Sequence, residues 1–214
     1  MKEEVYVDKL RYEKEFLNKG YNLIAGVDEV GRGPLAGPVV CCAVIMPLDQ
    51  DLLIDGVDDS KKISEKKRIK LAEIIKEKAI AYAIYQIEPD EIDAINILEA
   101  VKLCMAKAVE SLPISPDAVL VDGNNIHIDL SNAKSVKEHC YIVKGDANSY
   151  TIGCASIVAK VYRDKLMEDY AKIYPVYGFD KHKGYGTKAH IDAVKENGPC
   201  IIHRKTFIKN FWGK

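Results

Sequence analysis

Two apolar runs, residues 21–27 and 39–46, constrain the fold more than any other feature of this sequence. Both are short, and the second is rich in β-branched side chains, so each favours a strand over a helix. The segment between them has three glycines and two prolines within residues 31–38, which is typical of a loop. We therefore predict two antiparallel strands joined by a Gly/Pro-rich loop. The glycine spacing and the prolines exclude a dinucleotide-binding loop.

Acidic residues follow three of the predicted strands. Asp28 and Glu29 come directly after the first strand, and we expect that strand to end there, so that both carboxylates can turn toward one point. Asp122 follows a predicted strand at 118–121, and Asp146 follows another at 141–143. Carboxylates that converge in this way repel one another unless cations lie between them. Oxygen ligands suit Mg²⁺, and a pair of ions is a device for phosphodiester hydrolysis, so the four acids predict a two-metal hydrolytic site.

The remaining pattern predicts a further strand at 81–87 and helices at 7–19, 64–78, 89–110, 150–174 and 187–197. A chain of 214 residues suits one domain with a small appendage. We expect an N-terminal accessory helix (1–20), a catalytic core (21–174) and a basic C-terminal region packed on that core (175–214). No run has membrane-spanning length, the N-terminus does not resemble a signal peptide, and the six cysteines form no Cys-x-x-Cys pair. We expect a monomeric, cytoplasmic protein with reduced thiols and no membrane partner.

Charge is unevenly distributed along the chain. Residues 160–214 contain 12 Lys and Arg against 6 Asp and Glu, whereas the rest of the chain contains 19 against 26. An acidic body with a basic C-terminal end suits a carboxylate site beside a phosphate-binding flank. The same distribution could arise from charged helices that alternate by chance, and charge alone does not decide between these interpretations.

Six segments together make the chain resemble bacterial ribonuclease HII over nearly its whole length. They are GVDEVGRGP at 26–34, DSKK at 59–62, VDGN at 121–124, VKGD at 143–146, ASIVAKVYRD at 155–164 and HKGY at 182–185. Each is weak evidence alone, but their joint presence in this order is specific. The related ribonuclease HIII has Gly-Thr-Gly where this chain has Gly31, Arg32 and Gly33, and it carries an additional N-terminal domain.

The resemblance implies an α/β fold, with a ribonuclease H-like mixed five-stranded sheet flanked by helices and a basic C-terminal helical region. It implies hydrolysis of the RNA strand of RNA–DNA hybrids, including single ribonucleotides in duplex DNA. Cleavage would occur on the 5′ side of the ribonucleotide and leave 3′-hydroxyl and 5′-phosphate ends. The cofactors implied are two Mg²⁺ or Mn²⁺ ions, held by Asp28, Glu29, Asp122 and Asp146.

The resemblance also implies how the substrate is recognised. Main-chain groups of Gly31, Arg32 and Gly33 would sense the 2′-hydroxyl, and Tyr185 would pack on the sugar 3′ of the scissile phosphate. Candidate phosphate contacts are Lys61, Lys62, His182 and Lys183. The two adjacent lysines could equally be a solvated helix entrance, and the histidine could be a bystander.

The residues alone are also compatible with two other functions. A non-catalytic module that binds hybrids would keep the basic end but would not need four acids. Another nuclease of the same fold, acting on DNA junctions, would not need the Gly-Arg-Gly sensor. Asp164, inside the helix at 150–174, is predicted to be a structural partner of Arg163 or of a neighbouring basic group.

Overall fold

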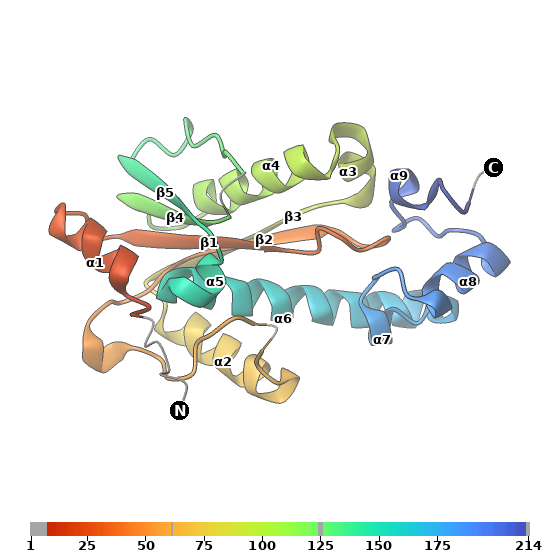
Figure 1. Cartoon of the computed structure of the whole chain (residues 1–214), viewed down its shortest axis with the longest axis horizontal. Helices are drawn as coiled ribbons and strands as arrows, with labels where there is room; N and C mark the ends of the chain where they lie inside the picture. The colour runs from red at the N-terminus through yellow and green to blue at the C-terminus, as the bar shows by residue number, and fades with distance from the viewer. Residues whose placement is uncertain (1–7, 61, 124–125, 213–214) are drawn as a thin grey trace, which may run out of the picture.

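A five-stranded mixed sheet forms the centre of the computed structural model, which describes residues 8–60, 62–123 and 126–212 (Figure 1). The strand order is β3-β2-β1-β4-β5. Strand β2 runs antiparallel to β1 and β3, whereas β4 runs parallel to β1 and β5. The strands are β1 (Ile24–Val30), β2 (Val39–Ile45), β3 (Ala81–Ile87), β4 (Ala118–Asp122) and β5 (Glu138–Ile142). The predicted mixed sheet and its central antiparallel pair are confirmed.

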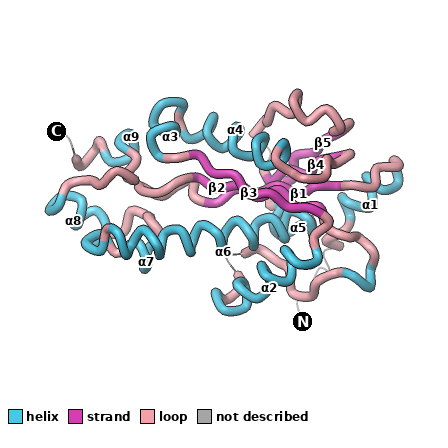
Figure 2. The backbone as a smooth tube through the Cα atoms, turned by 180° about the vertical axis from the view of Figure 1, so that it is seen from behind, coloured by secondary structure: helices cyan, strands magenta, loops and turns pink. Residues whose placement is uncertain are grey.

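Helices cover both faces of the sheet (Figure 1 and Figure 2). One face packs against α3 (Pro89–Ile95) and α4 (Ile97–Glu110), and the other against α2 (Glu65–Lys78) and α6 (Tyr150–Ile173). Alternate residues of β2 divide between the two cores, as the strand period requires: Cys41 packs with the α4 layer and Cys42 with the α6 layer. Both faces of β2 are therefore buried, which explains its continuous apolar sequence.

Helix α6 approaches the sheet closely at Gly26 of β1. A Cβ atom at this position would overlap the backbone of Thr151, in the first turn of α6. The missing side chain lets the start of α6 lie directly on the strand that carries two of the acids. The short helix α5 (Gly145–Asn148) immediately precedes α6 in the chain, so the close approach of α6 to β1 also positions α5.

Segments from both ends of the chain pack against this core. Helix α1 (Arg11–Asn18) places Phe16 against Ile24 and Ile152. Residues 175–212 lie at the far end of α6, beside the Gly/Pro-rich loop, where Ala36 forms an isolated bridge with His203. Their elements are a 3₁₀ turn (Pro175–Tyr177), α7 (Phe179–His182), α8 (Lys188–Asn197) and α9 (Lys205–Ile208). A further 3₁₀ turn spans Gln50–Leu52.

Four predicted elements have wrong boundaries. The helix predicted at 7–19 begins only at Arg11 and ends at Asn18. The helix predicted at 89–110 is interrupted at Asn96, whose φ of 68° breaks the helical backbone and whose side chain accepts hydrogen bonds from the amides of Leu98 and Glu99. Strand β5 lies at 138–142 rather than at 141–143. Strand β1 does not end before Asp28 but continues to Val30.

All six cysteines are free thiols. No helix among the described residues is long and apolar enough to cross a bilayer.

Candidate active site

Asp28 and Glu29 lie inside β1, where adjacent side chains begin on opposite faces of the sheet. The register of the sheet explains how they still meet. Strand β1 pairs with β4 only as far as Val27, whereas its pairing with β2 continues to Val30. Beyond Val27 one edge of β1 is therefore open, and both carboxylates can converge around it. One carboxylate oxygen from each of Asp28, Glu29 and Asp122 lies within 4.8 Å of the other two.

Asp122 and Asp146 are linked through α5. Asp122 is the last residue of β4, and its Oδ1 accepts a hydrogen bond of 2.6 Å from the amide of Gly145, the first residue of α5. Asp146 is the second residue of that helix, and the left-handed Lys144 separates it from the end of β5. Asp146 is not part of the tight group of three, but its charge acts on Asp28.

The electrostatics of the site centre on Asp28, which is 5% exposed. Burial raises the pKa of Asp28 well above its ordinary value, and repulsion from Glu29, Asp122 and Asp146 raises it further. A hydrogen bond with Ser156 opposes this shift, and the Ser156 hydroxyl also lies 3.0 Å from that of Ser60. A buried group of repelling carboxylates needs a compensating positive charge to stay ionised. Because all the donors are carboxylate oxygens, the site suits a hard divalent cation.

The Gly/Pro-rich loop lies directly beyond β1. Arg32 and Gly33 are exposed at its tip. Tyr185 lies beside them, since a Cβ atom at Gly33 would be 3.8 Å from Cε1 of the Tyr185 ring. A backbone hydrogen bond of 2.8 Å from Leu35 to Gly184 joins the two segments. The residues expected to read two neighbouring sugars are thus brought to one place, next to the acids.

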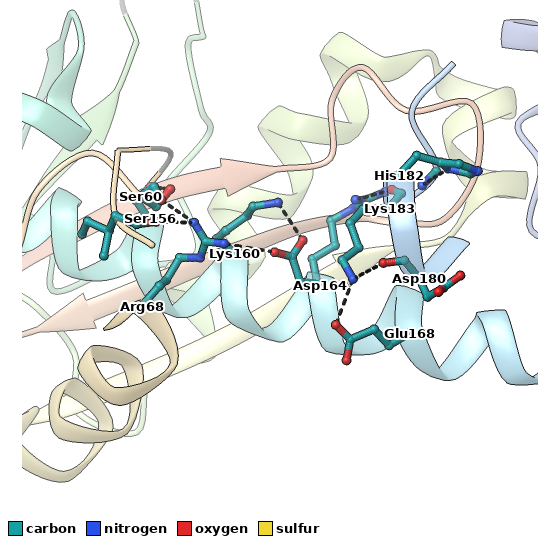
Figure 3. A network of polar contacts seen from close by, with 12 residues as sticks. Ser60, Arg68, Ser156, Lys160, Asp164, Glu168, Asp180, His182 and Lys183 are labelled. Carbon is teal, nitrogen blue, oxygen red and sulfur yellow. Dashed lines mark hydrogen bonds and ion pairs between the residues drawn. The ribbon is translucent and has the colours of Figure 1, made fainter. Parts of the chain in front are cut away.

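The candidate phosphate contacts lie in different settings. The Lys183 ammonium donates to Glu168 and to the carbonyl of Asp180 (Figure 3). His182 accepts from the amide of Gly184 at Nδ1, so its Nε2 donates to the carbonyl of Tyr177.

The side chains of His182 and Lys183 therefore stabilise the turn that carries Tyr185. Phosphate binding by these two residues stays a prediction. Lys62 is exposed, so its side chain is accessible from solvent, and phosphate binding by it stays a prediction. Lys61 lies outside the described residues.

Asp164 has basic neighbours other than Arg163. It lies 2.7 Å from Lys160 and 3.6 Å from Arg68, on the face of α6 that also carries Ser156 (Figure 3). Arg68 in turn donates to the carbonyl of Ser60, in the segment that ends at Lys62. The expected pairing with a neighbouring basic group is found, whereas Arg163 makes different contacts, described below.

Three residues that shape the site had no such role predicted from the sequence: Ser156, Arg163 and Arg204. One signal for Arg163 was available, because it follows Ala155 and Ala159 at a spacing of four and must share their buried helical face. Arg204 had no such signal, since it lies in a short irregular segment before α9.

Comparison with known proteins decides the family. Residues 25–212 match the family model described as ribonuclease HII. The ribonuclease HII of Lactobacillus acidophilus is 54% identical over 206 residues, which span 96% of this chain and 78% of that protein. The Bacillus subtilis enzyme is 50% identical over 204 residues, 95% of this chain and 76% of that protein. The chain belongs to the ribonuclease HII family.

Solved structures agree with this assignment of ribonuclease HII. The ribonuclease H2 of Pyrococcus horikoshii superposes with a TM-score of 0.73 at 28% identity, covering 90% of this chain and all of that one. The ribonuclease HII of Archaeoglobus fulgidus, solved in complex with PCNA, gives 0.72 at 27% identity, covering 86% and 94%. The ribonuclease H-like fold is confirmed. The chain is a type 2 ribonuclease H, a hydrolase that acts on RNA in RNA–DNA substrates.

Proposed function

We propose that this enzyme cuts on the 5′ side of a ribonucleotide, including a single ribonucleotide embedded in duplex DNA. The observation that carries the proposal is the short path from metal site to sugar-reading loop. Gly31 follows Glu29 after one residue, and Tyr185 lies beside Gly33. A site that contacts one ribose and the adjoining sugar has no need of a long RNA tract.

In this proposal the four acids hold the cofactor. Asp28, Glu29 and Asp122 would bind one Mg²⁺ or Mn²⁺ ion, and Asp146 with one of these acids would bind a second. Bound ions of this kind activate a water and stabilise the leaving oxygen, which would leave 3′-hydroxyl and 5′-phosphate ends. The protein orients the acids: the Gly145 amide fixes Asp122, and the Ser156 hydroxyl favours the charged form of Asp28.

Substrate binding is assigned to the basic C-terminal end. Residues 175–214 would bind phosphates without reading sequence, so affinity should fall as salt rises. Residues 21–174 would form the catalytic core, and residues 1–20 an accessory segment. All the acids and both sugar-reading segments come from one copy of the chain, so a monomer suffices for the reaction.

An Asp122→Asn variant tests the assignment of the metal site. We expect its cleavage of a duplex with one embedded ribonucleotide to fall more than about 100-fold in Mg²⁺, since losing only an outer partner of a ligand costs about 10–100-fold. Asp129→Asn is the matched control, because Asp129 is an exposed acid that bonds the amide of Ser131. Wild-type cleavage by Asp122→Asn would refute the assignment. Cleavage of an all-DNA junction by the wild-type enzyme would favour a junction nuclease instead.

A further inference from the structure

Two arginine side chains, Arg163 and Arg204, are completely buried beneath the Gly/Pro-rich loop. Among the described residues, their hydrogen-bond acceptors are main-chain carbonyl oxygens. Burial lowers the pKa of Arg163 to about 10 and that of Arg204 to about 9, because it disfavours the charged form. A guanidinium buried at such a cost needs many well-placed acceptors, and here the loop supplies most of them.

Arg204 binds the carbonyls at the tip of the loop. Its Nη2 donates to Gly31 over 2.6 Å and its Nη1 to Arg32 over 3.0 Å. Its Nε and Nη2 also donate to the carbonyl of Gly37, over 3.0 Å and 2.8 Å, where the loop returns to β2. One planar group thus fixes two consecutive peptide groups relative to the other side of the loop.

The direction of these carbonyls determines the direction of the amides. The peptide bonds described here are trans, so each C=O and its N–H point opposite ways. The inward carbonyl of Gly31 therefore turns the N–H of Arg32 outward, and the inward carbonyl of Arg32 turns the N–H of Gly33 outward. Both residues are exposed, and within the described part of the chain no hydrogen bond uses either amide.

Arg163 makes a different set of contacts. It donates to Pro38 and Ala36 at the base of the loop and to the carbonyl of Lys183, two residues before Tyr185. It therefore fixes the loop relative to the Tyr185 segment, but it does not bind the carbonyls of residues 31–33. Among the described side chains, only Arg204 donates to the two carbonyls whose direction sets these amides.

We infer that Arg204 is the positioning residue for ribose discrimination, because it holds the amides of Arg32 and Gly33 as a fixed pair of donors for the 2′-hydroxyl oxygen. Donors fixed before binding pay little ordering cost when the ribose arrives, and deoxyribose offers them no acceptor. The inference rests on the proposed function of the Gly31–Gly33 segment.

The test compares affinities for two duplexes of one sequence, one all-DNA and one with a single ribonucleotide, by fluorescence anisotropy in Mg²⁺. An Asp122→Asn background is used, so that the substrate stays intact. The ratio of the two dissociation constants measures discrimination. Arg204→Lys keeps the charge but cannot reach both carbonyls, and we expect it to reduce the ratio about tenfold, the equivalent of one net hydrogen bond of about 1.4 kcal/mol.

Arg68→Lys is the matched control, because Arg68 is also a buried guanidinium that donates to loop carbonyls, those of Ser60 and Ile63. The ratio of the two dissociation constants for Arg68→Lys should equal that of the Asp122→Asn protein without a second substitution. A merely structural role for Arg204 would weaken binding of both duplexes equally and leave the ratio unchanged, which would overturn the inference. A parent ratio of one would instead refute the proposed sensing by residues 31–33.

A second measurement does not depend on whether Arg204→Lys folds. In the wild-type protein without substrate, ¹⁵N relaxation of the Arg32 and Gly33 amides should give order parameters near about 0.85, as in rigid backbone. Values below about 0.6 would show a flexible tip and would overturn the inference.

Discussion

The buried carboxylate of Glu13 gives helix α1 a specific structural role. Its Oε1 accepts hydrogen bonds from the Ser149 hydroxyl and from the amide and hydroxyl of Thr151. Ser149 is the N-cap of α6, and it directly follows α5, the helix that carries Asp146. A second contact, from the Tyr150 amide to the Lys9 carbonyl, holds the same junction.

Glu13→Ala should destabilise the fold by about 3 kcal/mol. The Thr151 amide loses its acceptor in a fully buried position, which costs about 1–3 kcal/mol. The hydroxyls of Ser149 and Thr151 lie 3.3 Å apart and can hydrogen-bond each other when Glu13 is absent. Together they therefore add less than two further losses of about 1–3 kcal/mol. For a domain of this size, about 3 kcal/mol corresponds to a fall in Tm of about 6–12 °C.

Thermal and urea unfolding of Glu13→Ala measure this effect. Glu15→Ala is the matched control, because Glu15 lies on the same helix in an exposed ion pair with Arg11 and should change stability by less than about 1 kcal/mol. A loss below about 1 kcal/mol in Glu13→Ala would refute the reasoning.

The same carboxylate predicts a pH dependence. Burial raises the pKa of Glu13 from its ordinary value, and the hydrogen bonds only partly oppose this. The folded state therefore holds a proton on Glu13 that the unfolded state has already lost. This contribution to stability is present at low pH and is lost as the pH rises through the raised pKa. Glu13→Gln should lack this fall in unfolding free energy, and an identical pH profile would contradict the prediction.

Three further changes test other parts of the structure. Asp28→Asn removes a buried charge that its neighbours repel, so we expect a higher Tm without metal. In a thermal-shift assay we expect Mn²⁺ to stabilise the wild-type protein but not this variant, and an equal response of the two proteins to Mn²⁺ would exclude Asp28 as a ligand. Asn96→Ala removes the cap of α4 at a positive φ and should cost about 2 kcal/mol in urea unfolding, whereas Asn96→Gly should cost about 1 kcal/mol or less; equal losses would refute the backbone argument. Gly26→Ala forces a Cβ into the Thr151 backbone and should destabilise by more than about 3 kcal/mol, so a Tm close to that of the wild type would show that α6 can move away.

The structure brings three of the four predicted acids together, but not in the way that the sequence led us to expect. The apolar runs and the Gly/Pro-rich loop placed Asp28 and Glu29 at the centre of the fold, and this required only local patterns. The expected reason for their convergence was wrong, because β1 continues past both residues. They meet because β4 pairs with β1 only as far as Val121, and the register between two strands so distant in sequence cannot be inferred from the sequence of either strand.

The residues whose site roles were not predicted act through tertiary contacts. Arg204 binds the carbonyls of Gly31 and Arg32, which lie more than 170 residues away in the sequence. Because every residue has a main-chain carbonyl, the sequence does not indicate which carbonyls accept from a given arginine. Asn96 is different, because Asn caps helices well and adopts a positive φ more often than most residues. The strong helical pattern on both sides concealed this local signal.

Cleavage mapping tests the central claim most directly. The wild-type enzyme is incubated in Mg²⁺ with a duplex that contains one ribonucleotide, and both product ends are identified beside an all-DNA duplex of the same sequence. We predict a single cut on the 5′ side of the ribonucleotide, with 3′-hydroxyl and 5′-phosphate ends and no cleavage of the all-DNA duplex. A cut on the 3′ side, cleavage of the all-DNA duplex, or activity only on long RNA tracts would contradict the proposed reading of one ribose beside the metal site.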